Sequence, residues 1–307
     1  MPLFSVVIPV YNAALTLPAT IAALQAQTVT DWECILVEDA STDDSWQVAD
    51  ALVRTDRRLT LVRNPGKGPS AARNHGALTL ARGEIIAFCD ADDLWQPRKL
   101  QGVSLRILDR GADAAFGRIG FFRDTPEDVR TRSTLPMRPV TVPMLLGENP
   151  VCTLSNLSLR RSVFAALGGF REDIVHNEDL EFLIRLAGNG HRIEGIESDH
   201  VLYRLSPHGL SANLDAMRAG RAEALRTAAE LGYRPDPRAE AIHLRYLARR
   251  ALRLGAPARM VRRLVIEGCR EDARAFLLPA RRGALIACAA LTLPILPRAL
   301  RRKLFSN

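Results

Sequence analysis

The sequence predicts an α/β protein with a mostly parallel sheet flanked by helices and a basic helical C-terminal tail. Over residues 1–120, short apolar runs rich in Val, Ile and Leu alternate with segments of helical spacing, which is typical of parallel sheets with crossover helices. Residues 1–237 contain 26 Lys and Arg against 30 Asp and Glu, whereas residues 238–307 contain 16 against 4. The body is therefore slightly acidic, and the excess positive charge lies in the tail.

Four apolar runs are expected to form buried strands, separated by helical segments. The strands are Phe4–Val10, Glu33–Asp39, Leu59–Arg63 and Glu84–Asp90, and the helices cover 17–24, 48–52 and a segment from Pro69 that stops at Gly83. Residues 123–150 lose this pattern and are expected to be rich in loops. Later helices are predicted over 160–167 and after Asn177, and short basic helices after Pro237.

Composition excludes several classes of protein. With 307 residues, of which 47% are hydrophobic, the chain has ample material for a core and is not expected to be disordered. The five cysteines are scattered without a CxxC pair, so neither a disulfide framework nor a zinc site is expected. The basic tail has no Trp and few aromatic residues, so we expect no nucleic-acid partner.

Polar segments follow three of the predicted strands at their carboxyl ends, where parallel sheets bind ligands. They are PVYNA (9–13), EDASTDD (38–44) and CDADD (89–93). The spacing of Asp90 and Asp92 lets two carboxylates face one hard cation that also binds phosphate, such as Mg²⁺ or Mn²⁺. A simpler interpretation is that these aspartates cap the next helix, in which Pro97 suits an early position. The position at the ligand edge favours the cation.

Four sequence blocks together resemble the inverting glycosyltransferases of family 2, which have the GT-A fold. They are FSVVIPVYNAALTLPATIAALQAQT, ILVEDASTDDS, GPSAARNHGALTLARGEIIAFCDADD and GGFREDIVHNEDLEFLIRL, all within residues 3–210. The resemblance implies a Rossmann-like catalytic domain over 1–233, with a nucleotide-binding half at 1–122 and an acceptor half at 123–233. The tail, 234–307, lies outside it.

The resemblance implies a donor site for a nucleotide sugar, typically a UDP-sugar. Asp39 matches the aspartate that hydrogen-bonds the base, Arg73 matches a basic residue near the nucleotide, and Asp90 would contact the ribose or order the loop. Glu38 stands where the family commonly has Asp. The full donor set is Pro9, Val10, Tyr11, Asn12, Glu38, Asp39, Arg73 and Asp90.

The resemblance also implies the groups that act in transfer. Asp179 matches the base that removes the proton of the acceptor hydroxyl as it attacks C1 of the sugar. Asp92 matches a ligand of the divalent cation that neutralises the departing diphosphate, and His208 would be a further ligand. Asp93 and Glu178 are expected to support these groups or the acceptor. Taken alone, Glu178 and Asp179 could equally complement a helix N-terminus.

These assignments predict a non-processive enzyme that moves one sugar to a glycan or lipid-linked acceptor in surface polysaccharide or glycoconjugate synthesis. Processive synthases of the family have a Q-x-x-R-W block, which this chain lacks because its last Trp is Trp95. A sugar-nucleotide nucleotidyltransferase would have a Gly-rich loop where this chain has PVYNA, and a glycosidase would need two opposed carboxylates. A sugar-nucleotide nucleotidyltransferase and a non-catalytic nucleotide-sugar-binding module stay alternatives, because fold does not fix function.

The tail contains an apolar stretch, Gly283–Leu296, with arginines on both sides. It is too short to span a bilayer. Basic ends around a short apolar segment suit contact with an anionic membrane surface through residues 281–305, which predicts a cytoplasmic protein peripheral to the inner face of the cell membrane. The alternative is a pair of helices packed on the catalytic domain with solvated arginines.

Overall fold

A computed structural model describes residues 1–129, 131–205 and 214–292 of the chain. The chain divides into two compact units. The first comprises Met1–Val140 and Pro150–Pro207, and the second comprises Thr141–Asn149 and His208–Asn307. The second unit therefore takes a short segment from the middle of the sequence, and the boundary expected near residue 233 lies inside it.

The first unit is built on one sheet, whose nine described strands have the order β3-β2-β1-β4-β8-β6-β9-β5 with β7 beside β6. The strands are β1 (Phe4–Val10), β2 (Trp32–Glu38), β3 (Leu59–Arg63), β4 (Ile85–Phe88), β5 (Leu94–Trp95), β6 (Ala114–Phe122), β7 (Thr131–Arg132), β8 (Ser158–Arg160) and β9 (Ile193–Arg204). Strands β1 to β4 pair in parallel, as predicted. Beyond them the sheet is mixed, because β6 and β9 are parallel to each other and β5, β7 and β8 pair antiparallel.

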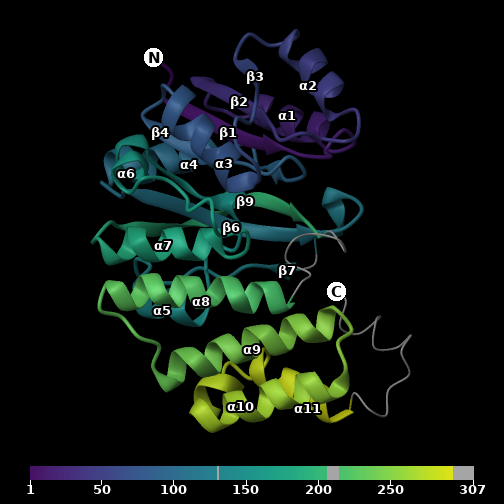
Figure 1. The fold of residues 1–307 in the computed structure, drawn as a ribbon, viewed down its shortest axis with the longest axis vertical. Coiled ribbons are helices and arrows are strands. Elements are labelled where there is room, and N and C mark those ends of the chain that lie inside the picture. The colour runs from purple at the N-terminus through teal and green to yellow at the C-terminus, as the bar shows by residue number, and fades with distance from the viewer. Residues whose placement is uncertain (130, 206–213, 293–307) are drawn as a thin grey trace. The chain divides into compact units, whose positions relative to one another are not determined.

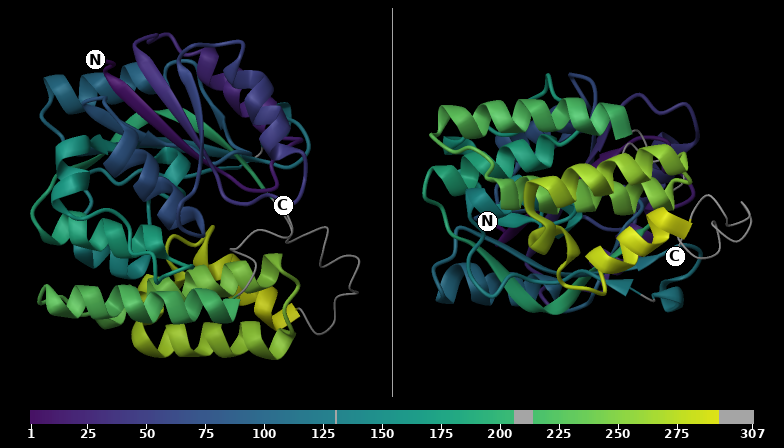
Figure 2. Two further views of the ribbon diagram at one scale, coloured as in Figure 1. Left: turned by 45° about the horizontal axis from the view of Figure 1, so that its top comes forward. Right: turned by 90° about the horizontal axis from the view of Figure 1, so that it is seen from below.

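Helices cover both faces of this sheet (Figures 1 and 2). Phe4, Val6 and Ile8 lie on one face of β1 in a core that includes Leu17 and Ile21 of α1. On the opposite face, a Cβ added to Gly76 would lie 2.5 Å from a methyl group of Val7. The helices are α1 (Leu17–Gln25), α2 (Ser45–Val53), α3 (Pro69–Asn74) with η1 (His75–Leu80), α4 (Lys99–Ser104) with η2 (Leu105–Asp109), α6 (Arg161–Ala166), α7 (Glu178–Gly188) and the short η3 (Pro126–Asp128) and η4 (Leu154–Asn156).

Four phenylalanine rings connect β4 with α6 and α7. Phe88, Phe164, Phe170 and Phe182 pack with ring centroids 4.9–5.3 Å apart in tilted and edge-to-face pairs. Such pairs add about 0.5–1.5 kcal/mol each beyond the burial of their area. The cluster therefore holds the start of α7 close to the turn that follows β4.

The second unit is a group of helices (Figure 2). They are α5 (Val142–Gly147), α8 (Leu214–Glu230), α9 (Pro237–Arg253), α10 (Ala258–Leu277) and α11 (Gly283–Thr292). Helix α9 begins where the sequence turns from acidic to basic: Asp236 caps it by accepting a bond of 2.7 Å from the Ala239 N–H, and Pro237 suits its first turn. Its apolar face packs with α10 and α11 around a core that includes Leu247, Leu264 and Phe276.

Helix α5 lies in a segment predicted to be mainly loop, and polar contacts bind it into the second unit. Arg221 of α8 donates to the Leu146 carbonyl at 3.1 Å and forms an ion pair of 3.0 Å with Glu240. Arg282 and Arg245 both lie within 4 Å of the Glu148 carboxylate. A six-residue helix has little stability of its own, so this one depends on tertiary contacts that no local pattern reveals.

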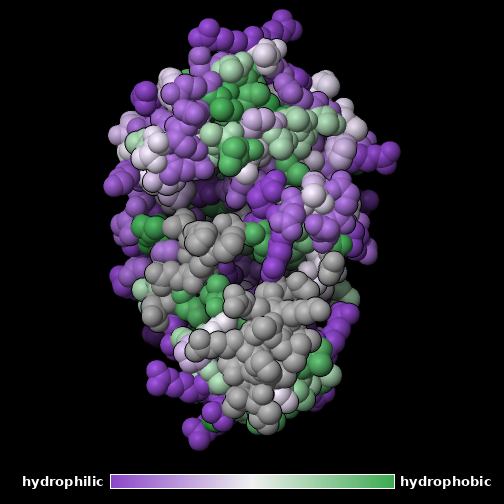
Figure 3. Space-filling model, turned by 90° about the vertical axis from the view of Figure 1, so that its right-hand side faces the viewer, coloured by the Kyte–Doolittle hydropathy of each residue, from purple (hydrophilic) through white to green (hydrophobic). Residues whose placement is uncertain are grey.

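The C-terminal apolar stretch forms α11 over Gly283–Thr292, the part that lies within the described residues. Ile286, Ala289 and Ala290 are buried in the core with α9 and α10, whereas Leu285 and Leu291 are 63% and 72% exposed. In the part of the chain that the structure describes, no helix has the length and apolarity needed to cross a membrane. Figure 3 shows one face of the molecule, on which hydrophilic residues predominate and apolar residues form separate patches.

Candidate active site

The site lies where β2, β1 and β4 end side by side. These strands are neighbours in the sheet and run parallel, so the polar segments that follow them emerge at the same edge. The segment after β1 begins at Tyr11, the segment after β2 at Asp39 and the segment after β4 at Cys89. The structure thus brings together the three segments that the sequence predicted to form a binding edge.

Asp39 is held at the end of β2 by two hydrogen bonds to its carboxylate. The Asn64 side-chain amide donates to Oδ1 at 2.7 Å, and the Gly68 backbone N–H donates to Oδ2 at 2.8 Å. Gly68 has φ of +89°, a conformation that favours glycine. Because each carboxylate oxygen accepts more than one bond, Asp39 keeps acceptor capacity for a ligand N–H in a fixed orientation.

The rest of the predicted base pocket is structured by β1 and β2. Glu38 is buried and accepts a bond of 2.5 Å from the Ser41 N–H, while Asn12 accepts one of 2.8 Å from Thr42. Tyr11 is 59% exposed, so its ring is available to a ligand. Pro9 is half-buried, but the Val10 side chain lies in the core, so Val10 contributes only backbone to this edge.

Arg73 of α3 connects two acidic segments. Its guanidinium is buried, donates to Asp90 Oδ1 at 2.7 Å and lies 3.4 Å from Glu178 Oε1. Burial by itself would lower the pKa of Arg73, but the charges of Asp90 and Glu178 raise it above its ordinary value. The predicted nucleotide site and the predicted catalytic carboxylates therefore share one cation.

Asp90 is the most firmly held residue of the turn after β4. Besides Arg73, it receives a bond of 3.1 Å from the Thr153 hydroxyl, and its backbone N–H donates to Ser155 Oγ at 2.8 Å. Asp93 N–H closes the turn on the Asp90 carbonyl at 3.2 Å. The D-x-D turn is thus tied to the segment that leads from α5 into η4.

Asp92 and Asp93 differ in environment. Asp93 is fully buried, its Oδ1 accepts from the Arg204 N–H at 3.1 Å, and burial raises its pKa well above the usual range. Asp92 is partly exposed, and burial together with the charge of Asp90 raises its pKa to about 6. Asp93 therefore attaches the turn to β9, and Asp92 is the carboxylate left to face a ligand.

Glu178 and Asp179 form the first turn of α7, as predicted. Asn177 precedes the helix in the left-handed region with φ of +61°, and its side chain makes no capping bond to the helix. Burial and the neighbouring Asp179 raise the pKa of Glu178 to about 7, and burial also raises the pKa of Asp179. Both carboxyls are thus shifted toward the range in which a group accepts protons near neutral pH.

Asn74, the residue after Arg73, holds the loop that precedes α7. Its side-chain amide donates to the Phe170 carbonyl at 2.8 Å and to Glu172 at 2.9 Å, and its Oδ1 accepts from the Phe170 N–H at 2.8 Å. Gly169 has φ of +74°, and a Cβ there would lie 2.5 Å from Asn74 Oδ1. Only glycine fits this close approach, which explains the GGF sequence.

Backbone strain is concentrated at the same edge. Among the described residues, the non-glycine positions with positive φ are Asn12, Ala40, Cys152 and Asn177. Each adjoins a segment already described: the ends of β1 and β2, the Thr153 segment and the start of α7. Such conformations are costly and cluster at functional sites, so their distribution supports this edge as the site independently of its charges.

Sequence comparison identifies the family. The family described as "Glycosyl transferase family 2" matches residues 5–168, more than half of the chain. The chain belongs to glycosyl transferase family 2. The match includes Asp39, Arg73 and the D-x-D turn and ends before Glu178 and Asp179.

Relatives of this family 2 chain are named as glycosyltransferases. Glycosyltransferase GlyG of Streptococcus pneumoniae is 31% identical over 115 residues, which are 38% of each protein. The UDP-Glc:alpha-D-GlcNAc-diphosphoundecaprenol beta-1,3-glucosyltransferase WfgD of Escherichia coli is 29% identical over 215 residues, 69% of this chain and 80% of that protein. The chain thus spans 38% of the length of GlyG and 80% of the length of WfgD.

The fold is shared with solved glycosyltransferase structures. The mannosyltransferase PcManGT from Pyrobaculum calidifontis, in complex with GDP-Man and Mn²⁺, aligns with a TM-score of 0.62 over 99% of this chain and 84% of that chain. Sequence identity is 20%. The family 2 chain therefore has the GT-A architecture that the sequence predicted.

The acidic turn fits a divalent cation. Asp90, Asp92 and Asp93 lie within four positions, and burial together with the charge of Asp90 raises the pKa of Asp92; a cation would offset the repulsion from Asp90. Within the described ranges no three His, Cys, Asp or Glu side chains are arranged as a complete ligand set. The proposed ligand His208 lies outside the described residues. Asp92 is the partly exposed carboxylate that would hold such an ion, with donor phosphates and water as its other ligands.

The family 2 site also depends on residues that the sequence did not single out. Asn64, Asn74, Thr153, Ser155 and Arg204 all bond to predicted site residues or to the loop before α7. Asn74 stands next to Arg73, so adjacency could have indicated it. The others lie 25 to 111 residues from their partners and have no local signal in the sequence.

Proposed function

We propose that this chain is a non-processive inverting glycosyltransferase that moves one sugar from a nucleotide sugar, a UDP-sugar, to a glycan or lipid-linked acceptor in surface polysaccharide or glycoconjugate synthesis. The observation that supports it most is the Asp90–Arg73–Glu178 contact, which joins the donor edge of the sheet to the first turn of α7. A module that only bound nucleotides would not need the second carboxylate, Asp179, beside this contact.

The proposed mechanism is a single displacement. The acceptor hydroxyl oxygen attacks C1 of the sugar, its proton passes to the Asp179 carboxylate, and the bond from C1 to the diphosphate oxygen breaks. Burial raises the pKa of Asp179, which increases its ability to take the proton near neutral pH. The Arg73 guanidinium lies between the carboxylates of Glu178 and Asp90 and holds both in place. A divalent cation held by Asp92 would supply charge neutralisation for the nucleoside diphosphate that leaves.

The donor assignment rests on Asp39, whose fixed carboxylate presents an acceptor to a base N–H such as that of uracil. The name of WfgD specifies UDP-Glc and a diphosphoundecaprenol-linked sugar, which supports a UDP-sugar as donor and a lipid-linked acceptor. A lipid acceptor would place the enzyme at the cytoplasmic face of the membrane. The exposed Leu285 and Leu291 of α11 are in keeping with the proposed contact through residues 281–305.

Binding of the donor is tested by thermal shift with UDP-, GDP-, dTDP- and CMP-sugars, each with and without Mn²⁺. A ligand at about 100 times its Kd stabilises the folded state by roughly 2.7 kcal/mol. We expect stabilisation by a UDP-sugar, greater with Mn²⁺, and loss of the Mn²⁺ effect in Asp92→Asn. Asp93→Asn is expected to lower the melting temperature itself, because Asp93 is fully buried and accepts a hydrogen bond from the Arg204 N–H of β9.

Transfer is tested by release of nucleoside diphosphate with a lipid-diphosphate-linked sugar as acceptor. We expect release to depend on the acceptor and to accompany a product one sugar larger. Donor binding without release in the presence of glycan and lipid-linked acceptors would instead identify a binding module. Release unaffected by EDTA would contradict the role of the cation.

A further inference from the structure

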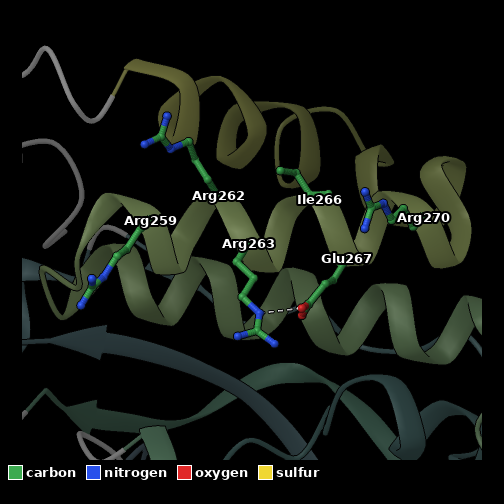
Figure 4. Close-up of a pocket in the computed structure, with 6 residues that line it drawn as sticks. All are labelled: Arg259, Arg262, Arg263, Ile266, Glu267 and Arg270. Carbon is green, nitrogen blue, oxygen red and sulfur yellow. Dashed lines mark hydrogen bonds and ion pairs between the residues drawn. The ribbon is translucent and has the colours of Figure 1, made fainter.

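Helix α10 presents one strongly basic face to solvent. A pocket of about 540 Å³ lies on this face (Figure 4). It is lined by Arg259, Arg262, Arg263, Ile266, Glu267 and Arg270, and we call these six residues the α10 arginine face. These positions recur at intervals of three and four residues, so they lie along one side of the helix. The opposite side bears Val261, Leu264 and Gly268, which are buried in the helical core.

The cations of this face are mostly uncompensated. Arg263 forms an ion pair of 2.7 Å with Glu267, as Figure 4 shows. Arg259, Arg262 and Arg270 are exposed and have no ion pair or side-chain hydrogen bond with any other residue that the structure describes. Four arginines and one glutamate leave a net charge of +3 on this face. Three guanidinium groups are therefore free to bind anions.

An apolar side chain lies among these charges. Ile266 is 51% exposed and sits between Arg262 and Arg270 along the helix. No aromatic side chain lines the face, so it lacks the stacking groups with which proteins bind single-stranded nucleic acids. Guanidinium groups bind phosphate oxygens in pairs, and an isoleucine between them suits the boundary between lipid headgroups and acyl chains.

We infer that the α10 arginine face binds the phosphate groups of an anionic phospholipid bilayer, with Ile266 inserted at the headgroup boundary. This rests on the membrane location in the proposed function and moves the principal contact to α10, outside residues 281–305. Each basic residue near an anionic surface strengthens attraction, so the three free arginines account for most of the binding. The α10 arginine face would hold the enzyme at the membrane, where lipid-linked acceptors lie.

The test is flotation of the full chain with vesicles of phosphatidylcholine alone or mixed with phosphatidylglycerol, without donor or acceptor. We expect the wild type to bind only the mixed vesicles. Arg259→Gln with Arg262→Gln and Arg270→Gln is expected to lower the partition coefficient roughly 100-fold, at about fivefold per charge. Ile266→Ser is expected to weaken binding by less, because it removes no charge.

The matched control changes three exposed arginines of the first unit, Arg57, Arg110 and Arg138, to glutamine, which lowers the net charge equally. It should bind as the wild type does. Equal loss in this control would reduce the effect to overall charge and overturn the inference. A triple α10 variant that binds like the wild type would overturn it while leaving the contact through 281–305 intact. Failure of the wild type to bind would reject both membrane contacts without bearing on sugar transfer.

Discussion

The acidic groups of the candidate site lie close together with few cations between them. Burial raises the pKa of Asp92 and Glu178 to about 6 and about 7, while Arg73 is the buried cation that joins two of the acidic segments. Such crowding is costly in a protein without ligand, and pKa shifts of this kind are concentrated at functional sites. At the scale of single residues, the site is therefore arranged for a cation, a proton or both.

The first prediction separates transfer from donor binding. Asp179→Asn keeps the size of the side chain but cannot accept a proton, so transfer should fall about 10²–10⁴-fold, the usual contribution of a positioned base. Donor Kd should change only a few-fold, because Asp39 and Asp92 lie on other segments. Glu178→Gln is expected to weaken donor binding as well, since Glu178 contacts Arg73. Donor Kd, melting temperature and transfer rate are measured on one preparation of each variant.

Asp173→Asn serves as control for Asp179→Asn, because Asp173 is exposed and forms an ion pair with Arg171 in the same loop. It should leave both donor binding and transfer unchanged. Parallel losses of stability, donor binding and transfer in Asp179→Asn would indicate a structural role. A fully active Asp179→Asn enzyme would end the proposed mechanism.

The second prediction concerns Lys99, which is fully buried at the start of α4. Its ammonium lies 4.6 Å from the centre of the Trp95 ring and 3.5 Å from the Asn156 carbonyl, and burial lowers its pKa to about 7. Between this value and the ordinary value of 10.5, the unfolded chain holds a proton that the folded chain has lost. Stability from this group therefore rises with pH across that window.

Lys99→Met removes the buried charge at similar volume and should raise the free energy of unfolding by about 1–4 kcal/mol near neutral pH, the range for such replacements. Because the wild type loses the charge as pH rises, the gain should shrink toward about pH 10. Melting temperatures of both proteins across this range give the comparison, with the control Lys67→Met, an exposed lysine. A variant less stable than the wild type at every pH would show that Lys99 is a satisfied structural cation.

At the scale of elements, α3 fixes α7 through side chains rather than through the sheet. The third prediction is that Asn74→Ala lowers the free energy of unfolding by about 1–3 kcal/mol, because it leaves buried backbone groups of Phe170 without partners. Transfer should fall more than donor binding, since the loop that leads to Glu178 and Asp179 loosens. Asn189→Ala, which removes one exposed bond to the Arg185 carbonyl, is the control. Unchanged stability in Asn74→Ala would show that the loop is held by the phenylalanine cluster alone.

Regular elements with strong local patterns were predictable from sequence. The strands Phe4–Val10 and Leu59–Arg63 have the predicted bounds. The first is almost wholly buried, as a continuous apolar run in a sheet covered on both faces requires, whereas the second lies at the end of the strand order and is less buried than predicted. Helix α5 was not predicted, since its burial depends on α9, which lies almost a hundred residues later. The same difference separates the predicted from the unpredicted site residues. Asp39 and Asp90 directly follow strands, so the sequence could locate them. Thr153 bonds to Asp90 only because the fold brings together two segments that are distant in the sequence.

At the scale of the whole molecule, the helical C-terminal part shares one compact unit with a segment from the middle of the sequence. The second unit contains Thr141–Asn149, and this segment continues directly into Cys152, Thr153 and Ser155, two of which bond to Asp90. The helices that pack on α5 therefore share a unit with a segment that leads, along the chain, to the residues that bond to Asp90.

The last prediction follows from this connection. A chain ending after Asp236 lacks α9 to α11, so α5 loses the contact in which Ala239 and Ile242 of α9 lie beside Gly147. Exposing apolar area equal to two leucine side chains costs about 3–6 kcal/mol, and the chain also loses the Arg221–Glu240 and Arg282–Glu148 ion pairs. We expect a melting temperature lower by roughly ten degrees or more, at about 2–4 °C per kcal/mol, together with reduced transfer.

A chain ending after Thr292 keeps every described helix and serves as control; it should melt as the full chain does. Equal stability and transfer in the chain ending after Asp236 would show that the first unit and α5 fold without the helices, and that α5 is supported by contacts other than those with α9.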